Sequence, residues 1–288
     1  MGTRYVLITA ARNEEKYIQK TIESVIAQSE RPTKWIIVSD RSTDNTDNIV
    51  REATKLVDFI ELLPLRGDDE RNFGSQVRAI NKGVQHIHVL EYDFIGNLDA
   101  DVTFEPQYFE RIFEKFADNP KLGLGGGFIC EEKQGKFVGR TTNNLRSVPH
   151  AVQMFRKECF QGIGGYLPLK YGGPDWCAEV MARMKGWEVS SFEDIKVLHH
   201  RPTSAAEGRW RGAFRSGLMD HSMGSHPIFE IIKCLRRVKN RPVIIGSFLR
   251  LIGYLYGCIN REERIVPKEV IEYLRLEQTS RMKMHFPL

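Results

Sequence analysis

The chain has 288 residues, of which 41% are hydrophobic and 27% are charged. This composition is typical of a folded globular protein and excludes a disordered one. Its five cysteines are odd in number and form no Cys-x-x-Cys pair, which argues against a disulfide framework and favours a reducing compartment. The apolar run at residues 5–11 is too short for a signal peptide and leads directly into charged residues. We therefore expect a cytoplasmic protein.

The net charge of +5 is unevenly distributed along the chain. Residues 201–288 contain 16 Lys and Arg against 8 Asp and Glu, a balance of +8, so residues 1–200 carry −3. A neutral-to-acidic body with a basic C-terminal part predicts contact between that part and something anionic. The candidates are a membrane surface, a lipid phosphate and a nucleic acid.

The first hundred residues alternate between apolar runs and amphipathic helices. The apolar runs predict strands at residues 5–11, 35–38 and 59–63, and a fourth strand that ends at Asp99. Strands that alternate with helices are typical of a parallel sheet with helices on its faces. We therefore expect an α/β fold that binds its ligands beyond the carboxyl ends of the strands.

Polar clusters follow three of these strands, at residues 12–14, at residues 40–44, and at Asp99 and Asp101. In extended backbone, side chains two residues apart point to the same side, so both aspartates would face one ligand. Two like charges this close favour a hard divalent cation. The alternative is that both cap a turn before a helix near Pro106. No glycine-rich phosphate loop follows the first strand, which argues against a dehydrogenase or a P-loop enzyme.

The second half of the chain adds further strands. A glycine-dense strand at residues 123–129 allows the backbone to approach a ligand closely, or simply to pack tightly. Residues 131–144 are polar and predict a hairpin or loop. Residues 151–156 return to the sheet, and two more strands are expected at 188–192 and 195–198.

Residues 243–259 form the most apolar stretch of the basic C-terminal part. With 17 residues and Arg250 in the middle, the stretch is a poor membrane span. Lys and Arg residues on both sides suit a helix lying in the interface of an anionic leaflet. A helix packed on the rest of the chain or on a second subunit fits equally well, and both interpretations stay open.

The motifs at the strand ends resemble those of family 2 glycosyltransferases, which have the GT-A fold. The resemblance rests on TAARNE at residues 9–14, VSDRSTDNT at 38–46 and LDAD at 98–101, and with later motifs it covers residues 3–205. It implies a metal-dependent hexosyltransferase that transfers a sugar from a nucleotide-diphosphate sugar with inversion of configuration at the anomeric carbon. UDP is the expected nucleotide. It also implies a glycan or lipid-linked acceptor, cell-surface polysaccharide synthesis, and Mn²⁺ or Mg²⁺ as cofactor.

The resemblance assigns roles to individual residues. Asp40 would accept a hydrogen bond from the nucleobase of the donor, because a carboxylate can accept from the imide N–H of a pyrimidine. Glu14 and the backbone near Ala11 would hold the ribose, Asp99 would contact the ribose or the sugar, and Asp101 would ligate the metal. The expected nucleotide-binding residues are Ala11, Asn13, Glu14, Asp40, Arg78 and Asp99.

The chain departs from the family pattern near the nucleotide. Ser39 and Arg41 stand where Asp and Gly are commoner, and Arg41 has the length to reach the base or a phosphate. Gln76 stands where Lys is often found. Positive charge near the diphosphate is then expected from Arg71 or Arg78.

Asp175 matches the position of the family's catalytic base, although Pro174 replaces the Glu that usually precedes it. Inversion needs one carboxylate to take the proton of the acceptor hydroxyl. An ordinary helix N-cap is the alternative for Asp175, and the two roles are compatible. His200, at the end of the last predicted strand, is a candidate third metal ligand. His199 is the alternative, and a structural hydrogen bond or a phosphate contact would equally explain His200.

We expect a catalytic domain at residues 1–204, with a donor-binding part at 1–104 and an acceptor part at 105–204. Residues 205–288 are expected to form a helical extension that contacts a membrane or a second subunit of a homo-oligomer, and not a nucleic acid. One rival is a sugar nucleotidyltransferase, which would need a glycine-rich loop with a basic residue after the first strand. The other is a non-catalytic, transferase-like scaffold.

Overall fold

The computed structural model describes residues 2–67, 73–133, 136–140, 143–201, 208–237 and 244–285. Its strands are β1 (Tyr5–Ala11), β2 (Lys34–Asp40), β3 (Ile60–Leu65), β4 (Phe94–Asn97), β5 (Val102–Phe104), β6 (Leu122–Lys133), β7 (Lys136–Gly139), β8 (Met154–Arg156) and β9 (Glu188–His199). Its helices are α1 (Ile18–Ile26), α2 (Thr46–Leu56), α3 (Phe73–His86), α4 (Tyr108–Asp118), a 3₁₀ turn η1 (His150–Val152), α5 (Lys157–Gly162), α6 (Pro174–Met184), α7 (Arg209–Ser222), α8 (Pro227–Arg236), α9 (Ile245–Ile259) and α10 (Lys268–His285).

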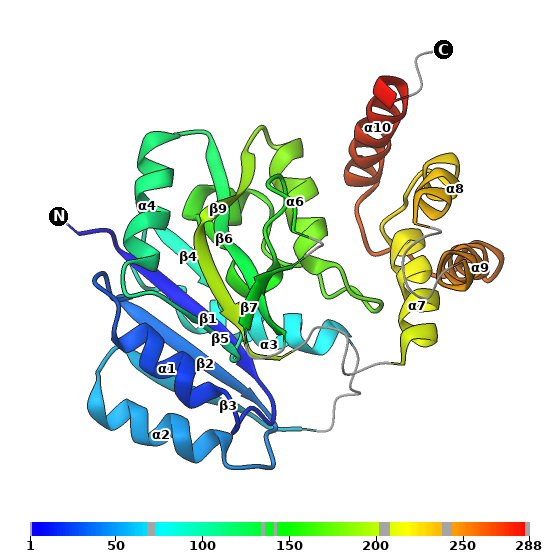
Figure 1. The fold of residues 1–288 in the computed structure, drawn as a ribbon. Helices are drawn as coiled ribbons and strands as arrows, with labels where there is room; N and C mark the ends of the chain where they lie inside the picture. Colours follow the sequence, from blue (N-terminus) through cyan, green and yellow to red (C-terminus); the bar gives the residue numbers. More distant parts are fainter. Residues whose placement is uncertain are drawn as a thin grey trace.

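Within these residues the strands form one sheet, ordered β3-β2-β1-β4-β8-β6-β9-β5, with β7 paired to β6. The strands β3, β2, β1 and β4 are mutually parallel. Antiparallel β8 joins β4 to β6, β9 runs parallel to β6, and β5 pairs antiparallel with β9. Helices cover both faces of the sheet (Figure 1). This mostly parallel, curled sheet is the α/β architecture that the sequence predicted.

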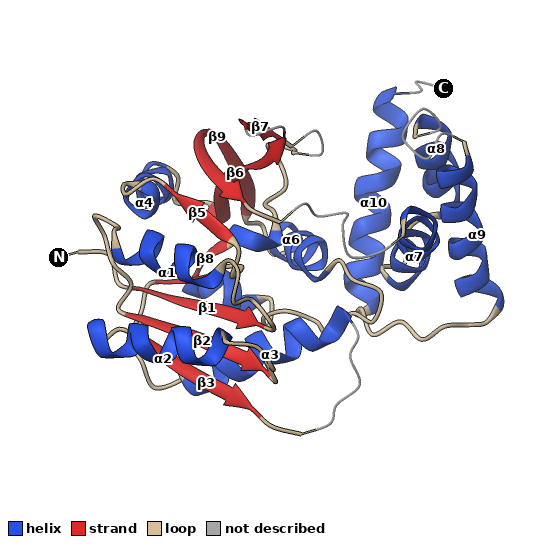
Figure 2. Cartoon of the chain, turned by 60° about the horizontal axis from the view of Figure 1, so that its bottom comes forward, coloured by secondary structure: helices blue, strands red, loops and turns tan. Residues whose placement is uncertain are grey.

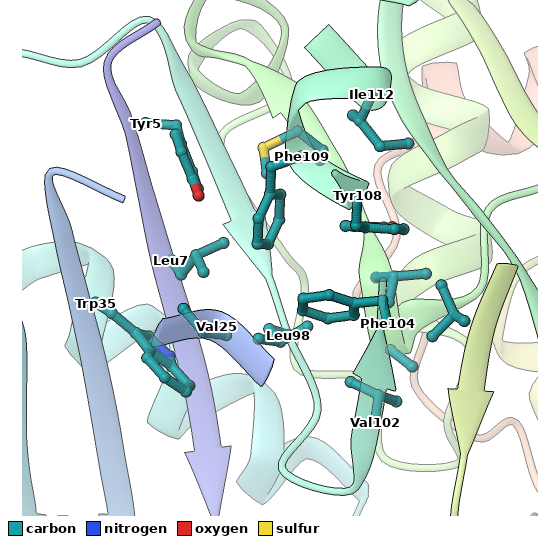
Figure 3. Packing of buried hydrophobic residues seen from close by; sticks show 14 of the residues in the cluster. Tyr5, Leu7, Val25, Trp35, Leu98, Val102, Phe104, Tyr108, Phe109 and Ile112 are labelled. Carbon is teal, nitrogen blue, oxygen red and sulfur yellow. The ribbon is translucent and has the colours of Figure 1, made fainter. Parts of the chain in front are cut away.

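The core lies on both faces of the sheet because β1 is buried on both sides. Tyr5 and Leu7 point to one face, where Tyr5 packs against Phe109 of α4 with ring centroids 4.9 Å apart (Figure 3). Val6 and Ile8 point to the other face and join a cluster with α3, α5 and α6. Residues that alternate between two apolar faces in this way produce the continuous hydrophobic run seen in the sequence.

The predicted strands agree with the structure except at three places. Residues 151 and 152, expected in a strand, belong to the 3₁₀ turn η1, and β8 begins only at Met154. β4 ends at Asn97, so Asp99 and Asp101 lie in the turn between β4 and β5 and not in extended backbone. The two strands expected at 188–192 and 195–198 are one strand, β9, with a bulge. Phe192 pairs with Gly127 and Lys196 with Phe128, so residues 193–195 are looped out of the ladder.

Helices α7 to α10 form a helical extension beside the sheet, and Figures 1 and 2 both place α9 at its outer edge. α7 and α9 cross at glycines: a Cβ on Gly217 would lie 1.9 Å from the Arg250 carbonyl oxygen, and one on Gly253 would lie 2.0 Å from the Phe214 carbonyl oxygen. α10 packs back against the part of the chain that holds the sheet, because its Val270 belongs to the same buried cluster as Val6 and Ile8 of β1. Among the described residues, no helix is long and apolar enough to cross a membrane.

Candidate active site

The centre of the site is the turn that carries Asp99 and Asp101, at the carboxyl end of β4. Backbone bonds hold the turn in place: Leu98 N–H donates to the Ile8 carbonyl (3.0 Å) and Asp99 N–H to the Ala151 carbonyl (3.0 Å). Asp99 is partly exposed, whereas Asp101 is buried. The two carboxylates are therefore fixed between β1 and the segment that leads into β8.

His199 completes a cluster of three metal-ligating side chains. Ligand atoms of Asp99, Asp101 and His199 all lie within 4.8 Å of one another. The antiparallel pairing of β5 with β9, which sets Val102 opposite His199, brings the imidazole to the turn. His200 points elsewhere, since its Nε2 lies 2.9 Å from the Thr103 hydroxyl. The structure thus brings His199 to the two aspartates, and not the His200 that the sequence suggested first.

The donor set of this cluster fits a hard divalent cation. Oδ1 of Asp101 and Nδ1 of His199 are buried without a hydrogen-bond partner, and buried polar atoms are seldom left in that state. Burial lowers the pKa of His199, but the carboxylates of Asp101 and Asp99 outweigh it and the pKa is raised. Two carboxylates and an imidazole are ligands that Mn²⁺ accepts.

Arg201 links the turn to the loop after β1. Its Nε lies 3.3 Å from Oδ2 of Asp101, and its guanidinium forms an ion pair with Glu14. Burial and the charges of Asp101 and Asp99 raise the pKa of Glu14 to about 7, and Arg201 opposes this rise. Glu14 is therefore a member of the same charged cluster as the two aspartates.

His150, from the turn η1, occupies the other side of Asp99. Its Nδ1 lies 3.5 Å from Oδ1 of Asp99, and the Gln76 side-chain amide donates to the same oxygen (3.2 Å). Burial would raise the pKa of Asp99, but the neighbouring His150 outweighs it, and the pKa lies below its usual value. Asp99 thus stays ionised. Its neighbour from α3 is Gln76, which stands where the family pattern often has Lys.

The loops after β1 and β2 are tied together. Asn13 has a left-handed backbone conformation (φ 56°), and its side-chain oxygen accepts a hydrogen bond from Thr43 N–H (2.8 Å). Glu14 N–H donates to the Thr46 hydroxyl (2.7 Å). Asn13 therefore shapes the loop that presents Glu14, and Ala11 is the last residue of β1, buried at the same edge of the sheet.

A pocket of about 290 Å³ lies beside this edge and contains both Asp40 and Arg78. Asp40 is buried between two arginines: Nη2 of Arg41 lies 2.6 Å from its Oδ1, and Nη1 of Arg12 lies 3.6 Å from its Oδ2. Arg41 adopts φ 57°, a left-handed conformation that favours glycine, which explains why Gly is commoner at this position. Arg71, the other expected source of charge, lies outside the described residues.

Asp175 stands in the first turn of α6, partly buried. Burial lowers the pKa of His150, but the carboxylate of Asp99, with a smaller contribution from Asp175, raises it. Burial raises the pKa of Tyr166, and Asp175 adds to this rise. The rings of His150 and Tyr166 lie 5.4 Å apart. The preceding loop is held by the helical extension, because Arg215 of α7 donates to the Tyr171 carbonyl (2.8 Å). Asp175 therefore lies close enough to His150, the neighbour of Asp99, for its charge to act on that imidazole.

Sequence reasoning missed two residues of the site, His150 and Arg201. Neither lies in a local motif, and each reaches the aspartate turn through pairing across the sheet: His150 through the segment before β8, and Arg201 at the end of β9. A polar residue directly after a predicted strand was the available signal for Arg201. His150 follows a loop and gave no comparable signal.

This arrangement of fold and site defines a GT-A glycosyltransferase. The family model for glycosyl transferase family 2 matches residues 6–171, more than half of the chain, and the chain belongs to that family. A poly-beta-1,6-N-acetyl-D-glucosamine synthase of Staphylococcus aureus is 30% identical over 275 residues, which cover 88% of this chain and 62% of the relative. The chain thus spans less than two thirds of the length of this relative.

Two solved structures share the fold at low sequence identity. The mannosyltransferase PcManGT from Pyrobaculum calidifontis, in complex with GDP-Man and Mn²⁺, has a TM-score of 0.58 at 12% identity, and the likeness covers 100% of this chain and 82% of that one. Residues 1–349 of S. aureus TarS, in complex with UDP-GlcNAc, have a TM-score of 0.55 at 12% identity, with 98% and 92% covered. The family model thus confirms the predicted family, and these structures confirm the predicted fold class.

Proposed function

We propose that this glycosyltransferase moves a sugar from a UDP-sugar to a hydroxyl group of a glycan or lipid-linked acceptor, with inversion and with Mn²⁺ or Mg²⁺ as cofactor. The observation that carries the proposal is the convergence of ligand atoms of Asp99, Asp101 and His199 within 4.8 Å. The pocket around Asp40 lies at the carboxyl end of β2, which runs parallel to β1 and β4. We propose that this pocket takes the nucleobase and that the cluster holds a cation bound to the diphosphate.

The donor is proposed from the chemistry of the pocket and from the relatives. Asp40 offers carboxylate oxygens to an imide N–H, which uracil has between two carbonyls. Arg78 shares the pocket with Asp40 and would place positive charge near the diphosphate. TarS binds UDP-GlcNAc, and the staphylococcal relatives are named for a polymer of N-acetylglucosamine. UDP-GlcNAc is therefore the first donor to test.

Asp175 is proposed as the base that takes the proton of the acceptor hydroxyl as the sugar leaves the diphosphate. Asp101, His199 and Asp99 would hold the cation, which would neutralise charge on the departing diphosphate. Glu14 and Asn13, on the loop after β1, would contact the ribose. Proton transfer and charge neutralisation are thereby assigned to different elements of the fold.

The proposed organisation places catalysis in residues 1–204 and a basic helical extension in residues 205–288. The proposed location is cytoplasmic, and it rests on the five cysteines, all of which are unpaired. The proposed role is in cell-surface polysaccharide synthesis, by analogy with the S. aureus relatives. The predicted boundary at residue 204 falls in 202–207, outside the described residues.

A thermal-shift screen tests the donor directly. UDP-, dTDP- and GDP-sugars would each be added with and without Mn²⁺, because a ligand that binds only the folded state raises the melting temperature. We expect the largest rise with a UDP-sugar and Mn²⁺ together, and release of UDP on prolonged incubation. A larger rise with GDP-sugars would contradict the pyrimidine assignment of Asp40. The absence of any rise, and of any release, would favour a non-catalytic scaffold.

A further inference from the structure

The outer side of α9 is apolar along its whole length. Its exposed residues are Ile245, Phe248, Ile252, Leu255, Tyr256, Cys258 and Ile259. The large aliphatic and aromatic side chains recur at intervals of three and four residues, so they form one stripe along the helix. Figures 1 and 2 both show α9 at the outer edge of the molecule, with α7 between it and the sheet. The stripe therefore faces away from the catalytic part.

The one charged residue of α9 is turned to the inner side. Arg250 Nε lies 3.0 Å from a carboxylate oxygen of Glu230, and its guanidinium also forms an ion pair with Asp220. Lys233 completes the cluster, with its Nζ 2.6 Å from Asp220. The charge of Arg250 is thus compensated inside the extension, and Arg250 does not prevent the outer side of α9 from being apolar. No charged side chain of α9 reaches the outer side.

The neighbouring helix α8 extends the apolar surface. α8 packs against α9, and its Ile228, Ile231 and Leu235 are 57%, 47% and 66% exposed. We name the exposed residues of α9 together with these three the α8–α9 apolar surface. Exposed apolar residues concentrated on two adjoining helices, and not scattered singly, indicate a binding surface.

The charge around this surface distinguishes between two candidate occupants, a second copy of this chain and an anionic lipid bilayer. Exposed basic residues stand at its ends: Arg236 and Arg237 where α8 ends, and Arg261 and Arg264 after α9. The acidic Glu262 and Glu263 lie between the last two, and Glu262 already pairs with Tyr171 and Lys170. Residues 201–288 still carry +8. A second copy of this chain would bring two such charges together, whereas an anionic lipid surface would attract them.

We propose that the α8–α9 apolar surface docks on the surface of an anionic lipid bilayer, with α9 lying in the plane of the headgroups. α9 has 15 residues, fewer than the roughly 20 that a membrane-spanning helix needs. A short helix with an uncharged apolar side and basic residues at its ends suits the interface. This proposal concerns how the enzyme is held, and it stands whether or not the donor assignment is correct.

Vesicle co-sedimentation of the whole chain tests the proposal. We expect binding to phosphatidylcholine vesicles that contain phosphatidylglycerol, weak binding to phosphatidylcholine alone, and release at high salt. Phe248→Asp with Leu255→Asp should weaken binding by at least about tenfold, because charges then enter the apolar interface. Leu56→Asp with Val89→Asp is the matched control, since both residues are exposed (77% and 74%) on the catalytic part. Equal binding by wild type and the α9 variant would overturn the proposal.

Cys258, itself part of the α8–α9 apolar surface, allows a second measurement that needs no substitution there. It is the exposed cysteine, while Cys130, Cys159, Cys177 and Cys234 are buried, so a thiol-reactive, polarity-sensitive dye would label it selectively. We expect a blue shift of its emission when anionic vesicles are added. The same dye on Leu56→Cys, in a Cys258→Ser background, should not shift. If vesicles leave the spectrum unchanged and sedimentation shows a dimer that Phe248→Asp dissolves, a second copy covers the surface and the proposal is wrong.

Discussion

The imidazole Nε2 of His199 lies 3.3 Å from Oδ1 of Asp101, although the two residues are almost a hundred positions apart in the chain. β9 ends at His199, and the imidazole of the next residue, His200, lies against the Thr103 hydroxyl and not against Asp101. The pairing of Val102 with His199 decides which of the two faces Asp101.

We predict that His199→Ala weakens Mn²⁺-dependent UDP binding by at least about tenfold, because the cation loses one ligand. His200→Ala is the matched control and should change the affinity little, since His200 bonds to Thr103. Isothermal titration calorimetry of both variants gives the comparison. A larger loss in His200→Ala would mean that the proposed ligand set is wrong.

The stability of the protein should depend on pH through Glu179. Burial and the charge of Asp175 raise the pKa of Glu179 to about 8 from its ordinary 4.5, although Ser147 and the Val148 N–H donate to its carboxyl group. The folded state therefore keeps a proton that the unfolded chain releases above pH 4.5. This stabilisation is complete below that pH and is lost as pH rises toward 8.

Glu179→Gln should reduce this fall in the free energy of unfolding by about 1 kcal/mol per pH unit around neutral pH, since an amide does not titrate. Urea denaturation at several pH values measures the slope. The exposed Glu193→Gln variant controls for a general loss of negative charge and should keep the wild-type slope. An unchanged slope in Glu179→Gln would show that the Glu179 carboxyl group does not carry the effect.

The close crossing of α7 and α9 should be sensitive to a single methyl group. Gly253→Ala would place a Cβ 2.0 Å from the Phe214 carbonyl oxygen, so the helices must separate, and we expect a loss of about 2 kcal/mol or more in the free energy of unfolding. Gly162→Ala meets no atom within 4 Å and should change stability by no more than about 0.5 kcal/mol. Chemical denaturation of the two variants compares them, and equal stabilities would contradict the close crossing.

The parts of the fold that follow from local pattern were predictable. β1, β2 and β3 show in the sequence as apolar runs, and Asp40, Asp99 and Asp101 were identified because parallel strands end at one edge of the sheet. The turn that carries the two aspartates was only the alternative to the extended backbone that we expected, because β4 ends two residues earlier than the apolar pattern suggests.

Other features depend on long-range pairing and packing. His150 and Arg201 join the site through β8 and β9, and nothing near them in the sequence gives the register of those strands. For the same reason the choice between His199 and His200 had to wait for the structure. The compensation of Arg250 by Asp220 and Glu230 likewise arises only when α7, α8 and α9 pack together.

The most direct test of the proposal that Asp101 binds the metal and donor while Asp175 takes the proton compares Asp101→Ala with Asp175→Ala. Calorimetry with Mn²⁺ and UDP, together with a transfer assay, separates donor binding from catalysis. We predict that both variants lose transfer, that Asp101→Ala also loses metal-dependent UDP binding, and that Asp175→Ala binds UDP about as tightly as wild type. If Asp175→Ala abolished UDP binding as completely as Asp101→Ala, Asp175 would be part of the donor site and not the base.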